Sequence, residues 1–133
     1  SKSKSSAKKR TVSAKQKASS AKQKMSKKDR TVLENRKAKS IKAILCTPAT
    51  IGEKTDFSNP QDGDLNEYSK IIRDIARKNS LSLVDLRKAF LDHNLKNNPD
   101  NKTSGILTSD GVHLNAKGNQ FVADEMWKVL QAY

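Results

Sequence analysis

Charge and aromatic side chains divide this chain near residue 40. Residues 1–40 hold 15 of the 27 basic residues and only 2 of the 14 acidic ones, so this segment carries the whole net charge of +13. All six aromatic residues lie in residues 41–133, where basic and acidic residues balance. A segment with high net charge and few large apolar side chains cannot bury enough surface to fold alone. We therefore predict one folded domain, residues 41–133, preceded by a basic arm, residues 1–40.

The basic arm repeats Ser-Ala-Lys with a period of seven, at positions 6–8, 13–15 and 20–22. A heptad coiled coil needs two apolar positions in each repeat, and alanine is the only regular apolar residue here. We expect the arm to be disordered alone, with some nascent helix from Ala, Lys and Gln. Two interpretations stay open: the arm binds nucleic acid or another polyanion in a salt-dependent way, or it is a low-complexity extension without a binding role.

Several classes of protein are excluded by simple counts. The longest unbroken apolar run covers only residues 43–46, which is far too short to span a membrane. No apolar stretch near the start resembles a secretory signal, so we expect a cytoplasmic protein or a processed secreted form. Cys46 is the only cysteine, which excludes an intramolecular disulfide and the cysteine-based zinc patterns. We expect no cofactor and no metal.

Two short apolar runs rich in branched side chains predict two β-strands, residues 41–46 and 81–86. Residues 47–63 between them contain two prolines and two glycines and predict a long loop. The rest of the connection has helical spacing, so the two strands should form a parallel pair joined by a right-handed crossover. The predicted fold class is therefore α/β.

Apolar residues at helical spacing predict three helices. The first follows Asp64 as its cap, the second covers residues 87–95, and the third follows Asn115 as its cap. The residues of the second helix that we expect to face inward are Ala89, Phe90 and Leu91. In the third helix, we assign Trp127 to the core.

Two strands are few for a parallel sheet, since such sheets are normally covered on both faces and contain more strands. Both predicted strands have an exposed edge. We therefore expect that the arm, a partner, or the rest of a larger fold completes the sheet, or that the chain associates with itself through these edges.

Asp110 and His113 form the most informative chemical motif of the chain. They lie three residues apart in an Asp-Gly-Val-His segment before the last helix. A carboxylate at this spacing can fix the tautomer of the imidazole and stabilise its protonated form, which leaves the other nitrogen as a general base for a hydroxyl nucleophile. The alternative is a loop hydrogen bond that only caps the last helix.

From about residue 41 to residue 130 the chain resembles the SGNH (GDSL-type) family of esterases and lipases. The similar segments are Cys-Thr-Pro at 46–48, Val-Asp-Leu at 84–86, and Asp-Gly-Val-His-Leu-Asn-x-x-Gly at 110–118. The resemblance implies a flavodoxin-like sheet of about five parallel strands. It also implies a Ser–His–Asp hydrolase of acyl esters or acetylated sugars, with His113 as base and Asp110 as its orienting partner.

The chain departs from the family at the nucleophile. It contains no Gly-Asp-Ser tripeptide and no Gly-x-Asn-Asp segment, where the family carries its nucleophile and oxyanion donors. Ser104, Ser109 and the serines of the arm lack the elbow geometry of such a nucleophile. Loss of the nucleophile from a comparable triad costs about a million-fold in turnover. We therefore expect little or no esterase activity from this chain alone, and a truncated or recombined reading frame is a further alternative.

Other candidate residues receive structural interpretations. We expect His93 to be a surface residue and Cys46 to be a small buried apolar residue at a strand end. Four acidic residues cluster in the sequence, but their spacing alone does not make a calcium site. They are Asp56, Asp62, Asp64 and Glu67.

Overall fold

The computed structural model describes residues 26–133, apart from the side chains of residues 36 and 37. The chain separates after Lys42 into an N-terminal unit and a unit that covers residues Ala43–Tyr133. In the described part, no helix is both long enough and apolar enough to cross a membrane.

The N-terminal unit contains one described helix, α2 (Lys27–Ala38). Ser26 caps it, since the backbone N–H of Asp29 donates to Ser26 Oγ at 3.1 Å. Val32 is 56% exposed, so this helix does not bury a broad apolar face. Most of the arm, residues 1–25, lies outside the described residues, and its disorder stays a prediction.

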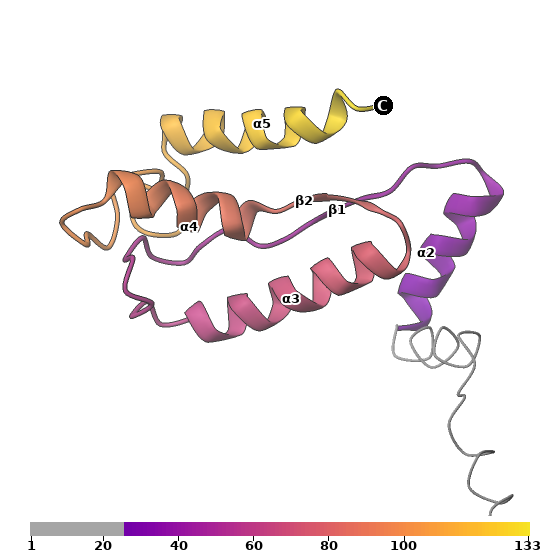
Figure 1. Ribbon diagram of the computed structural model, residues 1–133, viewed down its shortest axis with the longest axis horizontal. Helices are drawn as coiled ribbons and strands as arrows, with labels where there is room; N and C mark the ends of the chain where they lie inside the picture. Colours follow the sequence, from indigo (N-terminus) through magenta and orange to yellow (C-terminus); the bar gives the residue numbers. More distant parts are fainter. Residues whose placement is uncertain (1–25) are drawn as a thin grey trace, which may run out of the picture. The chain divides into compact units, whose positions relative to one another are not determined.

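The second unit is built on two parallel strands, β1 (Ile44–Cys46) and β2 (Ser82–Val84). Leu45 lies opposite Leu83 in the register, and the helix α3 (Asp62–Lys78) lies in the connection between the strands. Each strand is shorter than predicted, but the parallel pair and the α/β class are confirmed. Figure 1 shows α3 and the last helix, α5 (Ala116–Leu130), on opposite sides of the two strands.

A small apolar core fills the space between β2, α5 and the remaining helix, α4 (Leu86–Asn97). Phe90 is fully buried in this core, and its ring meets that of Phe121 edge-on with the ring centroids 5.3 Å apart. The buried members of the cluster are Val84, Leu86, Phe90 and Leu107. Of the three residues predicted to face inward on α4, Phe90 is fully buried, and Ala89 and Leu91 are half-buried.

Helix α3 begins at Asp62, two residues before the predicted cap Asp64. A long-range contact explains this earlier start, because the buried side chain of Asp62 accepts a hydrogen bond from the guanidinium of Arg87 at 2.8 Å. The other predicted cap is confirmed. Asn115 accepts from the backbone N–H of Gly118 at 2.9 Å and starts α5.

Large apolar side chains remain exposed on both outer helices. Trp127 on α5 is 62% exposed, so its assignment to the core is wrong. Tyr68 and Ile71 on α3 are also more than half exposed. The physical reason is that a sheet of two strands offers a face too narrow to cover the whole apolar stripe of each helix.

A buried ion pair joins α4 to the start of α3. The side chains of Arg87 and Asp62 are 1% and 4% exposed, and their charged atoms lie 2.8 Å apart. The same guanidinium donates to the side-chain oxygen of Asn66 at 2.9 Å and to the backbone carbonyl of Ala49 at 3.3 Å. Because its donors are occupied by acceptors from α3 and from the loop after β1, the buried charge is well compensated.

Removal of one partner should therefore be costly. We predict that Asp62→Ala lowers the free energy of unfolding by about 3–5 kcal/mol, because it leaves the Arg87 charge buried without its partner. Asp74→Ala removes an exposed ion pair with Arg77 and should cost less than about 1 kcal/mol. Urea denaturation followed by circular dichroism measures both. Equal losses in the two variants would contradict this role of the buried pair.

Candidate active site

The structure brings Asp110 and His113 together on the loop before α5. Asp110 Oδ2 lies 2.7 Å from His113 Nδ1, within hydrogen-bond distance. An isolated antiparallel bridge between Thr108 and Leu114 closes this loop, and the Ser109 N–H donates to the His113 carbonyl at 2.9 Å. The pair therefore lies at the tip of a short hairpin-like loop.

Asp110 is held in its ionised form by donors on both of its oxygens. The backbone N–H groups of His113 and Val112 donate to Oδ1 at 2.7 and 2.9 Å, and the His113 ring binds Oδ2. The N–H of His113 is the largest cause, and together these bonds hold the pKa of Asp110 well below its ordinary value of 3.8. The fixed negative charge of Asp110 beside Nδ1 favours the tautomer with its proton on Nδ1, which leaves Nε2 as the basic nitrogen.

The side chain of His113 is 80% exposed. Among the described residues, no side chain forms a hydrogen bond with its Nε2, which can therefore meet a nucleophile or a substrate. Ser109 does not supply that nucleophile, because its hydroxyl donates to the backbone carbonyl of His113 at 3.2 Å. Helix α5 is capped by Asn115 and not by the pair, so the capping interpretation of Asp110 and His113 does not describe this loop.

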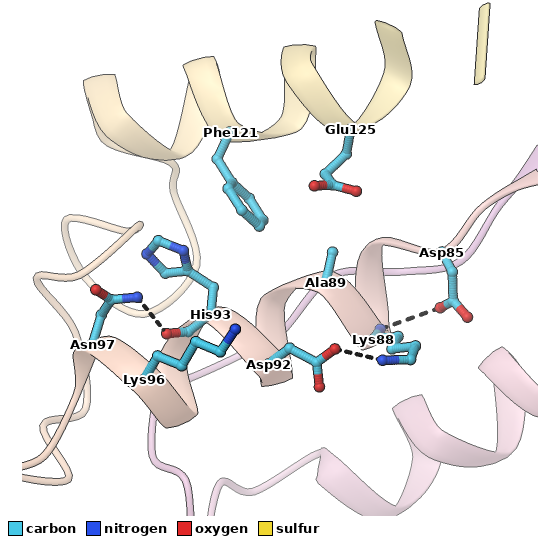
Figure 2. A pocket seen from close by; sticks show the side chains of 9 residues that line it. All are labelled: Asp85, Lys88, Ala89, Asp92, His93, Lys96, Asn97, Phe121 and Glu125. Carbon is cyan, nitrogen blue, oxygen red and sulfur yellow. Dashed lines mark hydrogen bonds and ion pairs between the residues drawn. The ribbon is translucent and has the colours of Figure 1, made fainter. Parts of the chain in front are cut away.

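His93 is not the simple surface residue that we predicted. It is half-buried and its ring lies 4.8 Å from that of Phe121, measured between centroids. Burial lowers the pKa of His93, and the charge of Lys117 adds to this shift. His93 and Phe121 both line a cavity of about 390 Å³ between α4 and α5. Figure 2 shows the two rings next to each other. Neither Asp110 nor His113 lines this cavity, so it is separate from the pair.

The remaining candidates do not form a site. Cys46 is exposed at the end of β1, contrary to the buried position that we predicted, and partial burial of the thiol raises its pKa. Asp62 binds Arg87, whereas Asp56 accepts from the side chain of Asn101 at 2.8 Å. In residues 26–133, no group of three His, Cys, Asp or Glu side chains is placed to hold a metal ion.

One residue of the site region was missed in the sequence. Glu53 is fully buried, and its carboxylate accepts from the backbone N–H groups of Ile106, Leu107 and Thr108. These donors are more than 50 residues away in the sequence, so no local pattern could have indicated the contact.

Comparison with known proteins assigns the family. Residues 3–126 match the family model of the GDSL-like lipases/acylhydrolases. The chain belongs to this family. The match begins at residue 3, so it extends into the basic arm, beyond the range of residues 41–130 over which we recognised the resemblance.

A solved structure supports the same assignment of this GDSL-family chain. The chain shares 54% sequence identity with an acetyl xylan esterase, AlAXEase, and it superimposes on the crystal structure of that esterase with a TM-score of 0.72. The similarity covers 85% of this chain and 55% of the esterase chain, so this chain spans about half the length of that esterase. The fold is thus part of the SGNH hydrolase fold. No curated protein sequence matches the chain.

The Asp110–His113 contact predicts an acid titration. We expect the carboxyl of Asp110 to titrate below pH 3.8, because its N–H and imidazole donors favour the ionised form. The sign for stability follows from linkage: the contribution of the pair is complete above about pH 4 and is lost as the pH falls through the folded pKa. Side-chain ¹³C NMR across pH 1.5–6 follows the titration of the Asp110 carboxyl, and His113→Ala should raise the midpoint of this titration. A midpoint at or above 3.8 in the unmodified chain would contradict the geometry.

Proposed function

We propose that this chain supplies the base and the orienting acid of a Ser–His–Asp ester hydrolase. His113 is the base and Asp110 is its partner. The observation that carries the proposal is the 2.7 Å contact between Asp110 Oδ2 and His113 Nδ1, in a chain of the GDSL-like lipase/acylhydrolase family. The similarity to an acetyl xylan esterase supports acetylated sugars as the substrate class.

In this proposal, His113 Nε2 takes the proton of a serine hydroxyl as that oxygen attacks the ester carbonyl. The imidazolium that forms is stabilised by the ionised Asp110 and then gives the proton to the leaving alcohol. A water molecule, activated by the same nitrogen, hydrolyses the acyl-enzyme. The low pKa of Asp110 suits this role because the carboxylate stays charged throughout the cycle.

The nucleophile is the part of the proposal that these 133 residues do not supply. The sequence has no Gly-Asp-Ser block, and in the described region no serine hydroxyl bonds to the His113 ring. We propose that the serine and the oxyanion donors come from a segment outside this sequence. The 133-residue chain alone should then show little turnover.

Hydrolysis of p-nitrophenyl acetate tests the proposal. The chain alone should give no turnover above the uncatalysed rate. The chain mixed with the part of AlAXEase that it does not match should gain turnover, because that part would supply the missing serine. In the mixture, Asp110→Asn should lower kcat by about 10⁴-fold, since it selects the wrong tautomer, and His113→Ala by at least as much.

His93→Ala is the matched control, because it removes the other histidine of the chain and should leave the turnover of the mixture intact. Turnover that survives His113→Ala would contradict the assignment of the base. Turnover by the chain alone that is lost in His113→Ala would instead show that the nucleophile lies within these residues.

A second candidate function rests on the charge distribution. The whole net charge of +13 lies in residues 1–40, which contain no aromatic residue. We propose that this arm binds polyanions such as duplex nucleic acid through phosphate contacts, with little sequence specificity. The Ser-Ala-Lys-Gln-Lys copies at 13–17 and 20–24 provide regularly spaced charges for such contacts.

A salt series tests the arm. The logarithm of the affinity for a DNA duplex should fall linearly with the logarithm of the salt concentration. Replacement of four repeat lysines by glutamine should reduce the slope by up to about 0.9 for each phosphate that the arm no longer neutralises. They are Lys15, Lys17, Lys22 and Lys24. An affinity that does not change with salt would contradict the proposal.

A further inference from the structure

Glu53 is a buried acid that neither proposed function uses. It follows Gly52 in the loop after β1, and its residue is 0% exposed. Among the described residues, its carboxylate forms no ion pair. A buried charge without a cation must be compensated by hydrogen bonds, so the donors around Glu53 show what the residue holds in place.

The donors are consecutive backbone N–H groups of one loop. Oε1 accepts from Leu107 at 2.6 Å and from Thr108 at 3.0 Å, and Oε2 accepts from Ile106 at 2.8 Å. The backbone of Glu53 adds a bond from its N–H to the carbonyl of Thr103 at 3.0 Å. All three partners of the Glu53 side chain are backbone N–H donors. A carboxylate has two acceptor oxygens and can satisfy all three, whereas a carboxamide has only one acceptor oxygen.

The neighbouring residue holds the other side of the same loop. The N–H of Gly52 donates to the carbonyl of Gly111 at 2.7 Å, and Gly111 lies between Asp110 and His113. Gly111 has a φ of +92°, and its own N–H donates to Thr108 Oγ1 at 2.9 Å. Gly52 and Glu53 thus bind the loop both before and within the motif that carries the pair.

The contact between Asp110 and His113 is local and spans only three residues. The motif can therefore form wherever the loop lies, but its position relative to the sheet depends on longer-range contacts. Those contacts include the burial of Leu107 in the apolar core and the hydrogen bonds of Gly52 and Glu53, which lie in the loop after β1.

We propose that Glu53 is a positioning residue, whose carboxylate fixes residues 106–108 and thereby sets the position of the Asp110–His113 pair relative to the sheet. The catalytic meaning of this role rests on the proposed hydrolase function. The placement itself is a property of the folded chain and can be measured without turnover.

Backbone ¹⁵N relaxation of the full chain tests the proposal. In the unmodified protein, the amides of Gly111, Val112 and His113 should have order parameters near the value of about 0.85 of a rigid backbone. In Glu53→Gln they should fall below about 0.6, because the carboxamide directs N–H toward N–H and releases the loop. The folded state of each variant is checked by the amide shifts of β1 and β2.

Asp85→Asn is the matched control. The carboxylate of Asp85 accepts from the side chains of Arg73 and Thr47 and from the N–H of Lys88, and it has no bond to residues 103–113. Its replacement also removes a multiply bonded carboxylate, but it should leave the three order parameters unchanged. Unchanged order in folded Glu53→Gln, or an equal decrease in both variants, would overturn the proposal.

Glu53→Asp keeps both acceptor oxygens and withdraws them by one methylene, so its order parameters should lie between those of the unmodified chain and Glu53→Gln. This variant decides the question if Glu53→Gln does not fold. If neither Glu53 variant folds while Asp85→Asn does, Glu53 holds the whole domain and the proposal is overturned. Absence of turnover in the mixture with AlAXEase would contradict the hydrolase function and leave this result unaffected.

Discussion

Buried hydrogen-bonded charge holds this domain together where a two-stranded sheet cannot. Arg87 binds the start of α3, the side chain of Asn66 and the loop after β1, and Glu53 binds the loop before α5. Both side chains bind segments that also reach the small apolar core around Phe90, since Leu107 belongs to this core and Ala49 and Ile106 pack against it. A well-compensated buried charge adds little stability by itself, but its removal leaves partners unsatisfied. The arrangement of these loops therefore depends on the two charged residues together with the core.

The geometry of the site depends on both local and long-range contacts. Asp110 and His113 meet because they lie three residues apart on a tight loop with Gly111 between them. The roles that we propose for them, a base and its partner, rest on this contact and on the donors to Asp110. The proposed esterase function also needs a nucleophile, which we propose comes from another segment. The match that begins at residue 3 indicates that the basic arm shares part of that family sequence.

Sequence patterns predicted the features that depend on neighbours in the chain. The parallel pair, the α/β class and the Asn115 cap follow from apolar periodicity and capping chemistry, and they are confirmed. The start of α3, the half-buried His93 and the role of Glu53 could not be predicted, because their partners lie far away in the sequence. Trp127 was assigned to the core because its spacing fits a buried stripe, but periodicity does not reveal how much sheet is present to cover it.

The exposure of Trp127 has a spectroscopic consequence. It is the only tryptophan of the chain, and it lies on the exposed face of α5, whereas Phe121 and Val129 of the same helix pack against the core. The fluorescence of an indole in water lies at longer wavelength than that of an indole in an apolar environment. The intrinsic emission of this chain therefore reports, without any added label, whether water or another polypeptide covers the outer surface of its last helix.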